Sequence, residues 1–279
     1  MINDIKGLGG WRRLDRRRLV FGSAIALAAS SFAGPALSAA ARLAPRGSGG
    51  MSHAAWDALL ARYVAPDGKG YNTVEYRRFR ADAMPDLHAY VAALQGAAPS
   101  SFGRQEAHAY WINLYNAKTI EIVLDHYPVA SIRDIDLGGG IFSRGPWSKK
   151  LLRVEGIELS LDDVEHEIVR PIFADPLSHY GLNCASYSCP NLAVRAYTGA
   201  NVGALLAAGA AEYICHPRGV AVDGGRITAS RIYDWYADDF GGRGGLKPHW
   251  LNFARPDHAR DIEQASIAAF RYDWRLNEV

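Results

Sequence analysis

Residues 105–126, QEAHAYWINLYNAKTIEIVLDH, form the longest helix that the sequence predicts. Tyr127-Pro128 follows directly and ends it, because the residue before a proline disfavours the helical conformation. Asn113 and Asn116 stand among Trp, Ile, Leu and Tyr in this helix, although helix interiors disfavour asparagine. We expect both amides to be partly buried and therefore to need hydrogen-bond partners. They either orient a catalytic group or clamp the backbone of a neighbouring loop, and the clamp is the more common use.

Local patterns predict the other elements. Two glycine-containing turns each separate short runs suited to strands, which predicts β-hairpins over 150–161 and 220–228. Ser160 and Asp163 have the spacing of a capping box, with which a helix begins. Helices are expected over 52–64, 84–94, 105–126, 162–170, 201–215 and 257–270. The fold class is therefore α+β, a mainly helical single domain with two small β-hairpins.

The first part of the chain has the composition of an export signal. Three arginines, 16–18, precede an uncharged run of small and apolar residues, 19–41, which is the layout of a cleavable signal peptide. The surrounding sequence Asp-Arg-Arg-Arg-Leu-Val resembles the twin-arginine type. We therefore expect a signal peptide over 1–41, a linker over 42–50 and one globular domain over 51–279. The protein would then be periplasmic or secreted, with membrane contact only if the leader is retained.

Charge and composition exclude some classes of function. The chain has 31 Lys and Arg against 29 Asp and Glu, a formal net charge of +2, and the two signs are mixed along the sequence. This is not the clustered basic charge of a nucleic-acid-binding domain. The expected partner is a small-molecule or peptide substrate. Three cysteines, Cys184, Cys189 and Cys215, are an odd number for an exported protein, so at least one thiol is left to be explained.

Four motifs follow one another along the chain: Trp-Ile-Asn-Leu-Tyr-Asn-Ala at 111–117, Val-Glu-His at 164–166, Leu-Asn-Cys with Ser-Cys-Pro at 182–190, and Trp-Tyr with Asp-Phe at 235–240. In this combination the chain resembles the family of domains of unknown function numbered 547, from about Met51 onward. The resemblance implies no particular reaction, because that family is named for the lack of an established activity. The chemistry therefore rests on the residues themselves.

The coil that we expect over 171–190, between two helices, carries the candidate nucleophile. Cysteine attacks as a thiolate, so it needs a nearby base and a group that orients this base. Cys184 has His166 and His179 within about twenty residues along the chain. The candidate orienting groups are Glu165, Asn113 and Asn116. These residue types suit acyl transfer, so we predict a cysteine-dependent hydrolase or acyltransferase with Cys184 as nucleophile and His166 or His179 as base.

Three alternatives use the same residues. Cys184 and Cys189 could form a disulfide, in which case the protein is a non-catalytic binding or scaffolding domain of the cell envelope. Together with His166 and His179 they could instead bind zinc, although the spacing matches none of the usual ligand patterns. Both cysteines could also be small buried hydrophobic residues. We expect no cofactor and no metal.

Two further segments are expected to be structural. Cys215 ends an alanine-rich helix, where a cysteine commonly packs against the core. The segment 231–240 places Asp238 and Asp239 beside Trp and Tyr side chains, which usually pack as well. Either carboxylate could edge a pocket, but packing is the more common role of such a segment.

Overall fold

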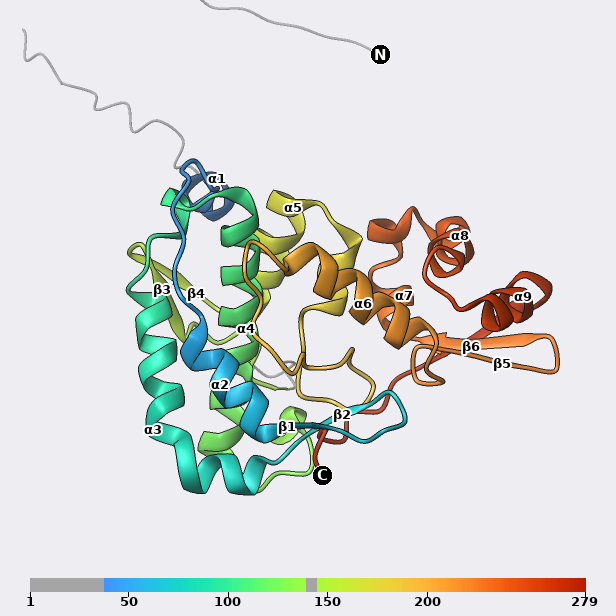
Figure 1. Ribbon diagram of the computed structural model, residues 1–279, viewed down its shortest axis with the longest axis horizontal. Coiled ribbons are helices and arrows are strands. Elements are labelled where there is room, and N and C mark those ends of the chain that lie inside the picture. Colours follow the sequence, from blue (N-terminus) through green and yellow to red (C-terminus); the bar gives the residue numbers. More distant parts are fainter. Residues whose placement is uncertain (1–37, 139–144) are drawn as a thin grey trace, which may run out of the picture. The chain divides into compact units, whose positions relative to one another are not determined.

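The computed structural model describes residues 38–138 and 145–279 (Figure 1). The predicted signal peptide, 1–41, lies outside these residues except for 38–41. Among the described helices, none combines the length and the hydropathy that crossing a membrane requires.

The core is built around α4, Arg104–His126, which is the long helix that the sequence predicted. Its side chains are buried almost without interruption from Ala107 to Leu124. A helix that is buried on all its faces belongs in the interior of a domain. α3, Tyr76–Gln95, packs along it, and α2, Ala54–Tyr63, packs on α3 (Figure 1).

Two short hairpins accompany these helices. β1, Val64–Pro66, pairs antiparallel with β2, Asn72–Val74, and β3, Leu152–Val154, pairs antiparallel with β4, Ile157–Leu159. The second pair is the hairpin predicted over 150–161, whereas the sequence did not predict the first.

The C-terminal part of the chain has a small sheet of its own. β5, Val220–Asp223, and β6, Arg226–Ser230, form the second predicted hairpin, and β7, Ser266–Arg271, pairs with β6 in parallel. A separate hydrophobic cluster, with fully buried Tyr233 and Trp250, packs in this part of the chain. Its helices are α6, Val202–Ile214, α7, Ile232–Trp235, α8, Leu246–Leu251, and α9, Pro256–Gln264.

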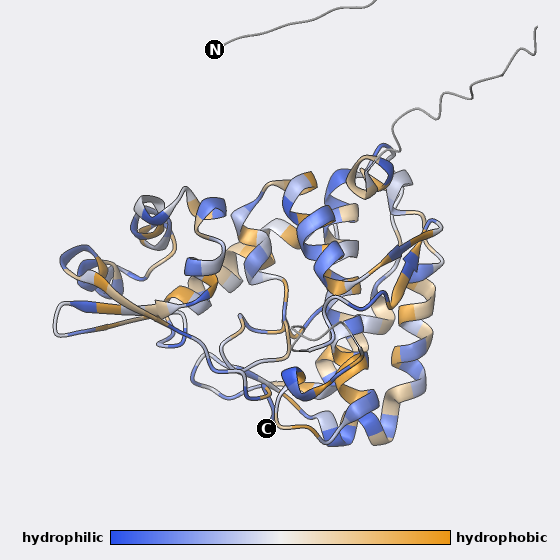
Figure 2. Cartoon of the chain, turned by 180° about the vertical axis from the view of Figure 1, so that it is seen from behind, coloured by the Kyte–Doolittle hydropathy of each residue, from blue (hydrophilic) through white to orange (hydrophobic). Residues whose placement is uncertain are grey.

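The helix predicted over 257–270 is wrong in its second half. α9 ends at Gln264, and the residues that follow form β7, in which Ile267 pairs with Ile227 of β6. Pairing with a distant strand is a tertiary contact, and it overrides helical spacing within the segment itself. The part that remains helical is mostly hydrophilic (Figure 2), and Ile262 is its buried residue.

The helix predicted over 162–170 is present, but most of it is a π-helix, Asp163–Val169, followed by α5, Arg170–Phe173. The capping box is confirmed. The backbone N–H of Ser160 donates to Asp163 Oδ2 at 2.5 Å, and that of Asp163 donates to Ser160 Oγ at 3.1 Å. π-Helical turns are rare and occur frequently at functional sites. Short 3₁₀ helices connect the larger elements at Pro99–Ser101, Ile132–Asp134, Pro176–Tyr180, Ala237–Phe240 and Arg243–Gly245.

The domain begins before Met51, earlier than expected. α1, Ala39–Leu43, is anchored by its last residue, which is fully buried. The backbone N–H of Gly47 donates to the carbonyl of Phe102 at 3.2 Å. The glycines of segment 42–50 suggested a linker, but the segment packs against the domain. Its hydrogen-bond partners lie in a distant part of the sequence, so the local composition does not reveal them.

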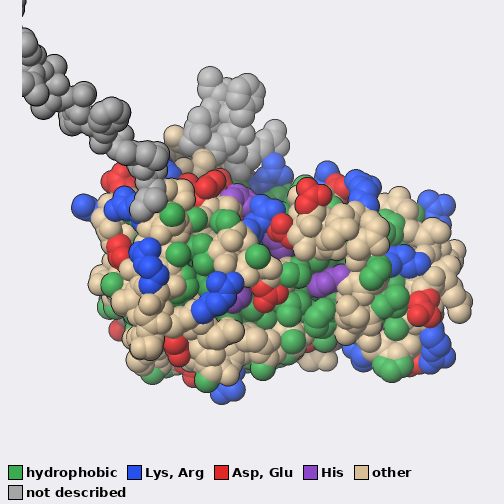
Figure 3. Space-filling model, turned by 90° about the horizontal axis from the view of Figure 1, so that it is seen from above, with side chains coloured by type: hydrophobic (Ala, Val, Ile, Leu, Met, Phe, Trp, Pro, Cys, Tyr) green, Lys and Arg blue, Asp and Glu red, His purple; other side chains and the backbone are tan. Residues whose placement is uncertain are grey.

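The fold class is confirmed as α+β and mainly helical, with three small sheets in the described residues where two hairpins were expected. On the face seen in Figure 3, acidic, basic and histidine side chains are mixed with hydrophobic ones. The arrangement brings α4, the π-helix, α7 and β7 to a common cavity.

Candidate active site

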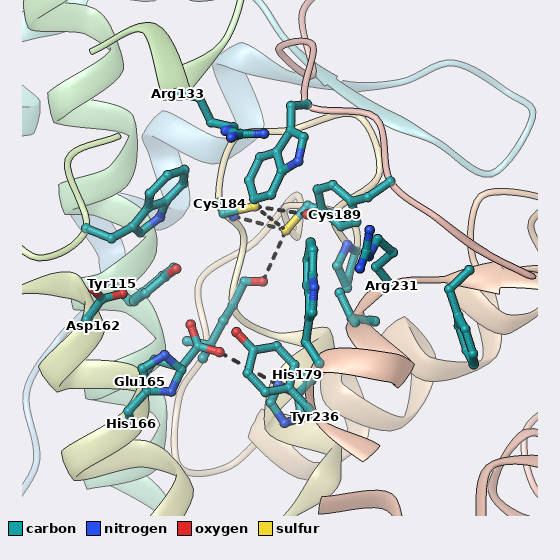
Figure 4. A pocket seen from close by; sticks show the side chains of 18 of the residues that line it. Tyr115, Arg133, Asp162, Glu165, His166, His179, Cys184, Cys189, Arg231 and Tyr236 are labelled. Atoms are coloured by element: carbon teal, nitrogen blue, oxygen red, sulfur yellow. Dashed lines mark hydrogen bonds and ion pairs between the residues drawn. The ribbon is translucent and has the colours of Figure 1, made fainter. Parts of the chain in front are cut away.

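A cavity of about 880 Å³ lies among these four elements. Tyr115 lines it from α4, and Glu165 and His166 line it from the π-helix (Figure 4). Cys184 and Cys189 line it from the coil that follows, and residues of α7 and β7 complete the wall. Ligand sites in proteins typically have about 300–1,000 Å³, so the cavity has room for a small organic molecule.

The two cysteines of the coil face each other. Their sulfurs are 3.1 Å apart, and both residues are free thiols. The backbone N–H of Cys184 donates to Cys189 Sγ at 3.0 Å. Cys184 Sγ also lies 3.1 Å from Ser186 Oγ and 3.2 Å from the hydroxyl of Tyr272. Three hydroxyl or thiol groups therefore surround the sulfur of Cys184.

These neighbours change the acidity of the two thiols in opposite directions. The hydrogen bond from the Cys189 thiol lowers the pKa of Cys184 to about 7 against the effect of burial, and Ser186 and Tyr272 add to it. Burial raises the pKa of Cys189 well above its usual value, and the neighbouring Cys184 raises it further. Near neutral pH the negative charge of the pair therefore lies on Cys184. The charged form, the thiolate, is the nucleophilic form of a cysteine.

A clamp from α4 positions the coil that carries this thiol. Asn116 Nδ2 donates to the carbonyl of Gly181 at 2.8 Å, and Asn116 Oδ1 accepts from the backbone N–H of Asn183 at 2.8 Å. Asn183 Oδ1 in turn accepts from the N–H of Ala185 at 2.9 Å. Ala185 has φ of 60°, in the left-handed region that residues other than glycine rarely adopt. The hydrogen bond thus holds a tight turn directly after Cys184.

Asn113 makes the same kind of clamp on another loop. Its Nδ2 donates to the carbonyl of Tyr197 at 2.7 Å, and its Oδ1 accepts from the N–H of Tyr197 at 3.1 Å. Both asparagines are almost completely buried. The described hydrogen bonds of both amides go to backbone groups, and none goes to a histidine. These contacts are those of a backbone clamp, the more common use of a buried amide.

The end of the chain supports the other side of the same coil. The N–H of Asn277 donates to the carbonyl of Ala185 at 3.2 Å, and the N–H of Tyr187 donates to the carbonyl of Arg275 at 2.7 Å. The turn that presents Cys184 is therefore fixed between α4 and the C-terminal segment.

His179 is buried and held between two carboxylates. Its Nε2 lies 2.7 Å from Asp239 Oδ2, and its Nδ1 lies 3.9 Å from Glu165 Oε1. The ring stacks on Tyr236 with 4.4 Å between the ring centroids. Glu165, the predicted orienting carboxylate, thus faces His179 at a distance longer than a hydrogen bond. Asp239, expected to be structural, is the closer partner.

Arg170 completes this cluster of charges. Its Nε and Nη2 donate to the two carboxylate oxygens of Asp239 at 2.6 and 3.0 Å. The hydrogen bond from His179, together with the one from Arg170, holds the pKa of Asp239 well below its usual range. Arg170 Nη1 also lies 3.2 Å from His166 Nδ1. A guanidinium can only donate hydrogen bonds, so His166 Nδ1 accepts this one. Neutral His166 therefore carries its proton on Nε2.

Two tyrosines lie between the carboxylate cluster and the thiols. Burial, and then the charge of Glu165, raises the pKa of Tyr115 well above its usual value. The pKa of Tyr236 is raised by burial first and then by the charge and the hydrogen bond of Glu165, with Cys184 contributing to both tyrosines. Figure 4 shows Tyr115, Glu165 and Tyr236 close together. Both phenols therefore stay protonated near neutral pH and are able to donate a hydrogen bond.

The remaining wall is aromatic and basic. Arg133 lies over the ring of Trp274 at 5.0 Å, and Arg231 lies over the ring of Trp235 at 5.6 Å. Arg271 also lines the cavity. Trp235 is 42% exposed, although large hydrophobic side chains are usually covered. This wall offers flat apolar surfaces with positive charges beside them.

Four of the six predicted site residues line one cavity: Cys184, His166, His179 and Glu165. The described hydrogen bonds of the Cys184 sulfur go to Cys189, Ser186 and Tyr272, and none goes to a histidine. Four further residues around the site were not predicted from the sequence: Tyr115, Arg170, Asp239 and Tyr272. Tyr115 and Asp239 lie inside quoted motifs, which was the available signal, whereas nothing in the sequence marks Tyr272.

The zinc alternative and the third cysteine, Cys215, can also be compared with the structure. No three or more His, Cys, Asp and Glu side chains in the described part of the chain are grouped so that they could hold a metal ion, so the zinc alternative has no ligand set there. Cys215 lies at the end of α6, where its sulfur accepts from the N–H of Arg255 at 3.3 Å, and it does not line the cavity.

Comparison with known proteins gave one match. No curated protein and no solved structure matched the chain. Residues 99–214 match the family model described as "Protein of unknown function, DUF547". This region is narrower than the resemblance from about Met51 onward, but it includes α4, the π-helix and both cysteines of the coil. Residues 99–214 of the chain are therefore a DUF547 domain, a domain type without an assigned function.

Proposed function

We propose that the protein is a cysteine-dependent hydrolase or acyltransferase in which Cys184 attacks an acyl carbonyl. The observation that carries the proposal is the position of the Cys184 sulfur, in a cavity of about 880 Å³ and within 3.2 Å of Ser186 Oγ, Cys189 Sγ and the Tyr272 hydroxyl. Hydrogen bonds to a sulfur favour its charged form. The nucleophile therefore does not depend on a histidine to remove its proton.

The histidines then have a different task from the one that the sequence suggested. Acyl transfer also needs a proton donor for the leaving group and a base for the attacking water or acceptor. His166, with its proton on Nε2, is the candidate donor, and the pair of His179 and Glu165 is the candidate base. Tyr115 and Tyr236 supply neutral hydroxyl groups that can donate to a developing oxyanion.

The aromatic and basic wall supports a class of substrate. Arg133, Arg231 and Arg271 favour a negatively charged group, and Trp235 offers its exposed ring to a flat or apolar one. We therefore propose a small-molecule or peptide substrate that carries a carboxylate next to its acyl bond. Export by the twin-arginine-type leader is likewise a proposal. N-terminal sequencing of the protein from a fractionated host would place the cleavage site near residue 41 if it is right.

The first test of the thiol is alkylation followed by intact-mass spectrometry. The Cys215→Ser protein is treated briefly with iodoacetamide at pH values from about 5 to about 9. This range includes both the pKa of an ordinary thiol and that of an activated one. We expect one adduct, which forms readily at pH 7. The rate of alkylation should fall about tenfold per pH unit well below the Cys184 pKa, which is about 7. The adduct must disappear in the Cys184→Ala variant. A reaction that appears only above pH 8, or that survives this substitution, contradicts an activated Cys184.

The second test is turnover of chromogenic acyl substrates. Esters and thioesters with a free carboxylate are compared with the same compounds carrying a neutral amide. We expect Cys184→Ala to reduce hydrolysis at least about a hundredfold, since it removes the nucleophile, and Arg231→Gln to reduce the preference for the carboxylate. The alternative, a non-catalytic envelope domain, predicts no turnover by the unmodified protein on either series.

A further inference from the structure

We infer that Cys184 and Cys189 form a redox-active pair, in which Cys184 reacts with a small-molecule disulfide and Cys189 resolves the mixed disulfide. The inference is carried by the two facing sulfurs, 3.1 Å apart, of which one lines a cavity as a half-buried side chain and the other is buried. It shares its thiol with the proposed function, but it needs neither an acyl substrate nor the histidines.

The two sulfurs, 3.1 Å apart, lie close to the distance of a disulfide bond. A disulfide has about 2.05 Å between its sulfurs, so the two atoms need to approach by only about 1 Å. The N–H of Cys184 donates to Cys189 Sγ, which keeps the two residues in register. The left-handed turn at Ala185 folds the chain back between them. A small rotation of the side chains is then sufficient, without movement of the elements that hold the coil.

The two thiols differ in the way that a nucleophile and a resolving group should. Cys184 holds the negative charge near neutral pH and is the one reached from the cavity. Cys189 is 5% exposed, and its thiol proton is held partly because the charge of Cys184 lies beside it. Once Cys184 carries a mixed disulfide, that charge is gone. The pKa of Cys189 then falls, and its thiolate forms where it can attack the adjacent sulfur.

A buried cation is placed to stabilise this second thiolate. Arg218 is 8% exposed, and its Nε donates to the carbonyl of Cys189 at 3.2 Å. The other described hydrogen bonds of its guanidinium go to Asn191 Oδ1 at 2.6 Å and to the carbonyl of Gly70 at 3.4 Å, which are neutral groups. A buried guanidinium without a carboxylate favours negative charge in its neighbourhood. Cys189 is the thiol whose backbone it binds.

The two steps balance as thiol–disulfide exchange. The Cys184 thiolate attacks one sulfur of the substrate disulfide, an S–S bond forms to Cys184, and one thiolate leaves. The Cys189 thiolate then attacks the Cys184 sulfur and expels the second thiolate. Two protein thiols are oxidised, one disulfide is reduced to two thiols, and the two protons pass to the leaving groups through solvent. The Cys184–Cys189 disulfide that results leaves no thiolate at Cys184 to attack an acyl carbonyl. This consequence rests on the proposed function.

The experiment uses glutathione disulfide as the probe and the full chain in the Cys215→Ser background. After incubation at pH 7 and acid quenching, we expect a mass lower by two hydrogen atoms with no retained glutathione. Peptide mapping should join Cys184 to Cys189, and dithiothreitol should restore both thiols. A protein that keeps glutathione, or that does not react while folded, overturns the inference.

Two variants separate the roles of the cysteines. Cys189→Ser should retain one glutathione on Cys184, because no thiol remains to resolve it, whereas Cys184→Ser should react at least about tenfold more slowly than the pair. Equal rates for Cys184→Ser and the pair, with unchanged circular dichroism, contradict the assignment. If only the acyl-transfer proposal fails, the protein turns over no ester but still exchanges with glutathione disulfide.

If only the redox inference fails, the protein keeps a stable mixed disulfide with glutathione or does not react with it, while Cys184 still reacts with iodoacetamide.

Discussion

The thiol of Cys184 and the carboxylate of Asp239 both hold negative charge more readily than isolated side chains do. Hydrogen bonds are the leading cause in both cases, from Cys189 to Cys184 and from His179 to Asp239. Burial alone would have the opposite effect on an acid. At the scale of single residues, the chemistry of the cavity is therefore set by which donors face each acid.

The contribution of the hydrogen bonds at Asp239 can be measured as a change in the free energy of unfolding. Because its folded pKa is lowered, its ionised form stabilises the folded state above its ordinary pKa, and this contribution is lost as the pH falls below about 4. We expect Asp239→Asn to reduce the free energy of unfolding by about 1–3 kcal/mol at pH 7, since three charge-assisted hydrogen bonds, two from Arg170 and one from His179, weaken. The gap to the unmodified protein should narrow toward pH 3. Urea unfolding at both pH values measures it.

Asp238 gives the control for this prediction. It is the neighbouring carboxylate on the same short 3₁₀ helix, Ala237–Phe240, and it makes no described ion pair. We expect Asp238→Asn to change the free energy of unfolding by less than about 0.5 kcal/mol. Equal effects of the two substitutions would show that the contacts of Asp239 with His179 and Arg170 contribute nothing.

At the scale of elements, α4 does more than fill the core. Through Asn113 and Asn116 it holds two separate stretches of irregular backbone, one at Tyr197 and one at Gly181 to Asn183. The spacing of three along a helix puts both amides on one side of α4. A helix buried on all faces is held in place by its packing, so it can position the coil that carries Cys184.

The two asparagines form a matched pair for a test of that role. Each makes two buried hydrogen bonds, so Asn113→Ala and Asn116→Ala should each cost about 2–5 kcal/mol of unfolding free energy. Asn116→Ala should in addition loosen the donors around Cys184 and raise the midpoint of its alkylation above pH 7, its present pKa being about 7. Asn113→Ala should leave that midpoint unchanged. Equal midpoints in both variants would show that the clamp of Asn116 does not position the thiol.

At the scale of the whole molecule, the cavity depends on parts of the chain that lie far apart. The family match covers residues 99–214, whereas Tyr236, Asp239 and Tyr272 come after it and α3 comes before it. The C-terminal segment pairs with the coil at Ala185 and Tyr187. The matched region thus holds the thiols but not all the groups that surround them.

A fragment of residues 99–214 tests this dependence. Without α3, buried α4 would expose much of its apolar surface, and without Tyr272 the sulfur of Cys184 would lose a donor. We expect no cooperative thermal transition by circular dichroism, in contrast to residues 38–279, and an iodoacetamide reaction with the pH dependence of an ordinary thiol. A fragment that melts cooperatively and keeps a midpoint near pH 7 would place the whole site inside the matched region.

Local sequence was sufficient for most elements and for the candidate nucleophile. Helical spacing, turn residues and the Ser160–Asp163 capping box predicted α4, both hairpins and the start of the π-helix, because these depend on neighbours within a few residues. The residue types alone also singled out Cys184, His166, His179 and Glu165, which line one cavity.

The tertiary structure alone decided how those groups are used. Pairing with β6 makes residues 266–270 of the expected helix part of a strand, β7, and brings Tyr272 to the sulfur of Cys184. It also gave Asp239, instead of an asparagine, the contact with His179. Sequence distance cannot order such contacts, because a hydrogen bond depends on approach within about 3 Å and the folded chain brings together residues of any separation. The sequence by itself determined which chemistry was available, and the fold determined which groups carry it.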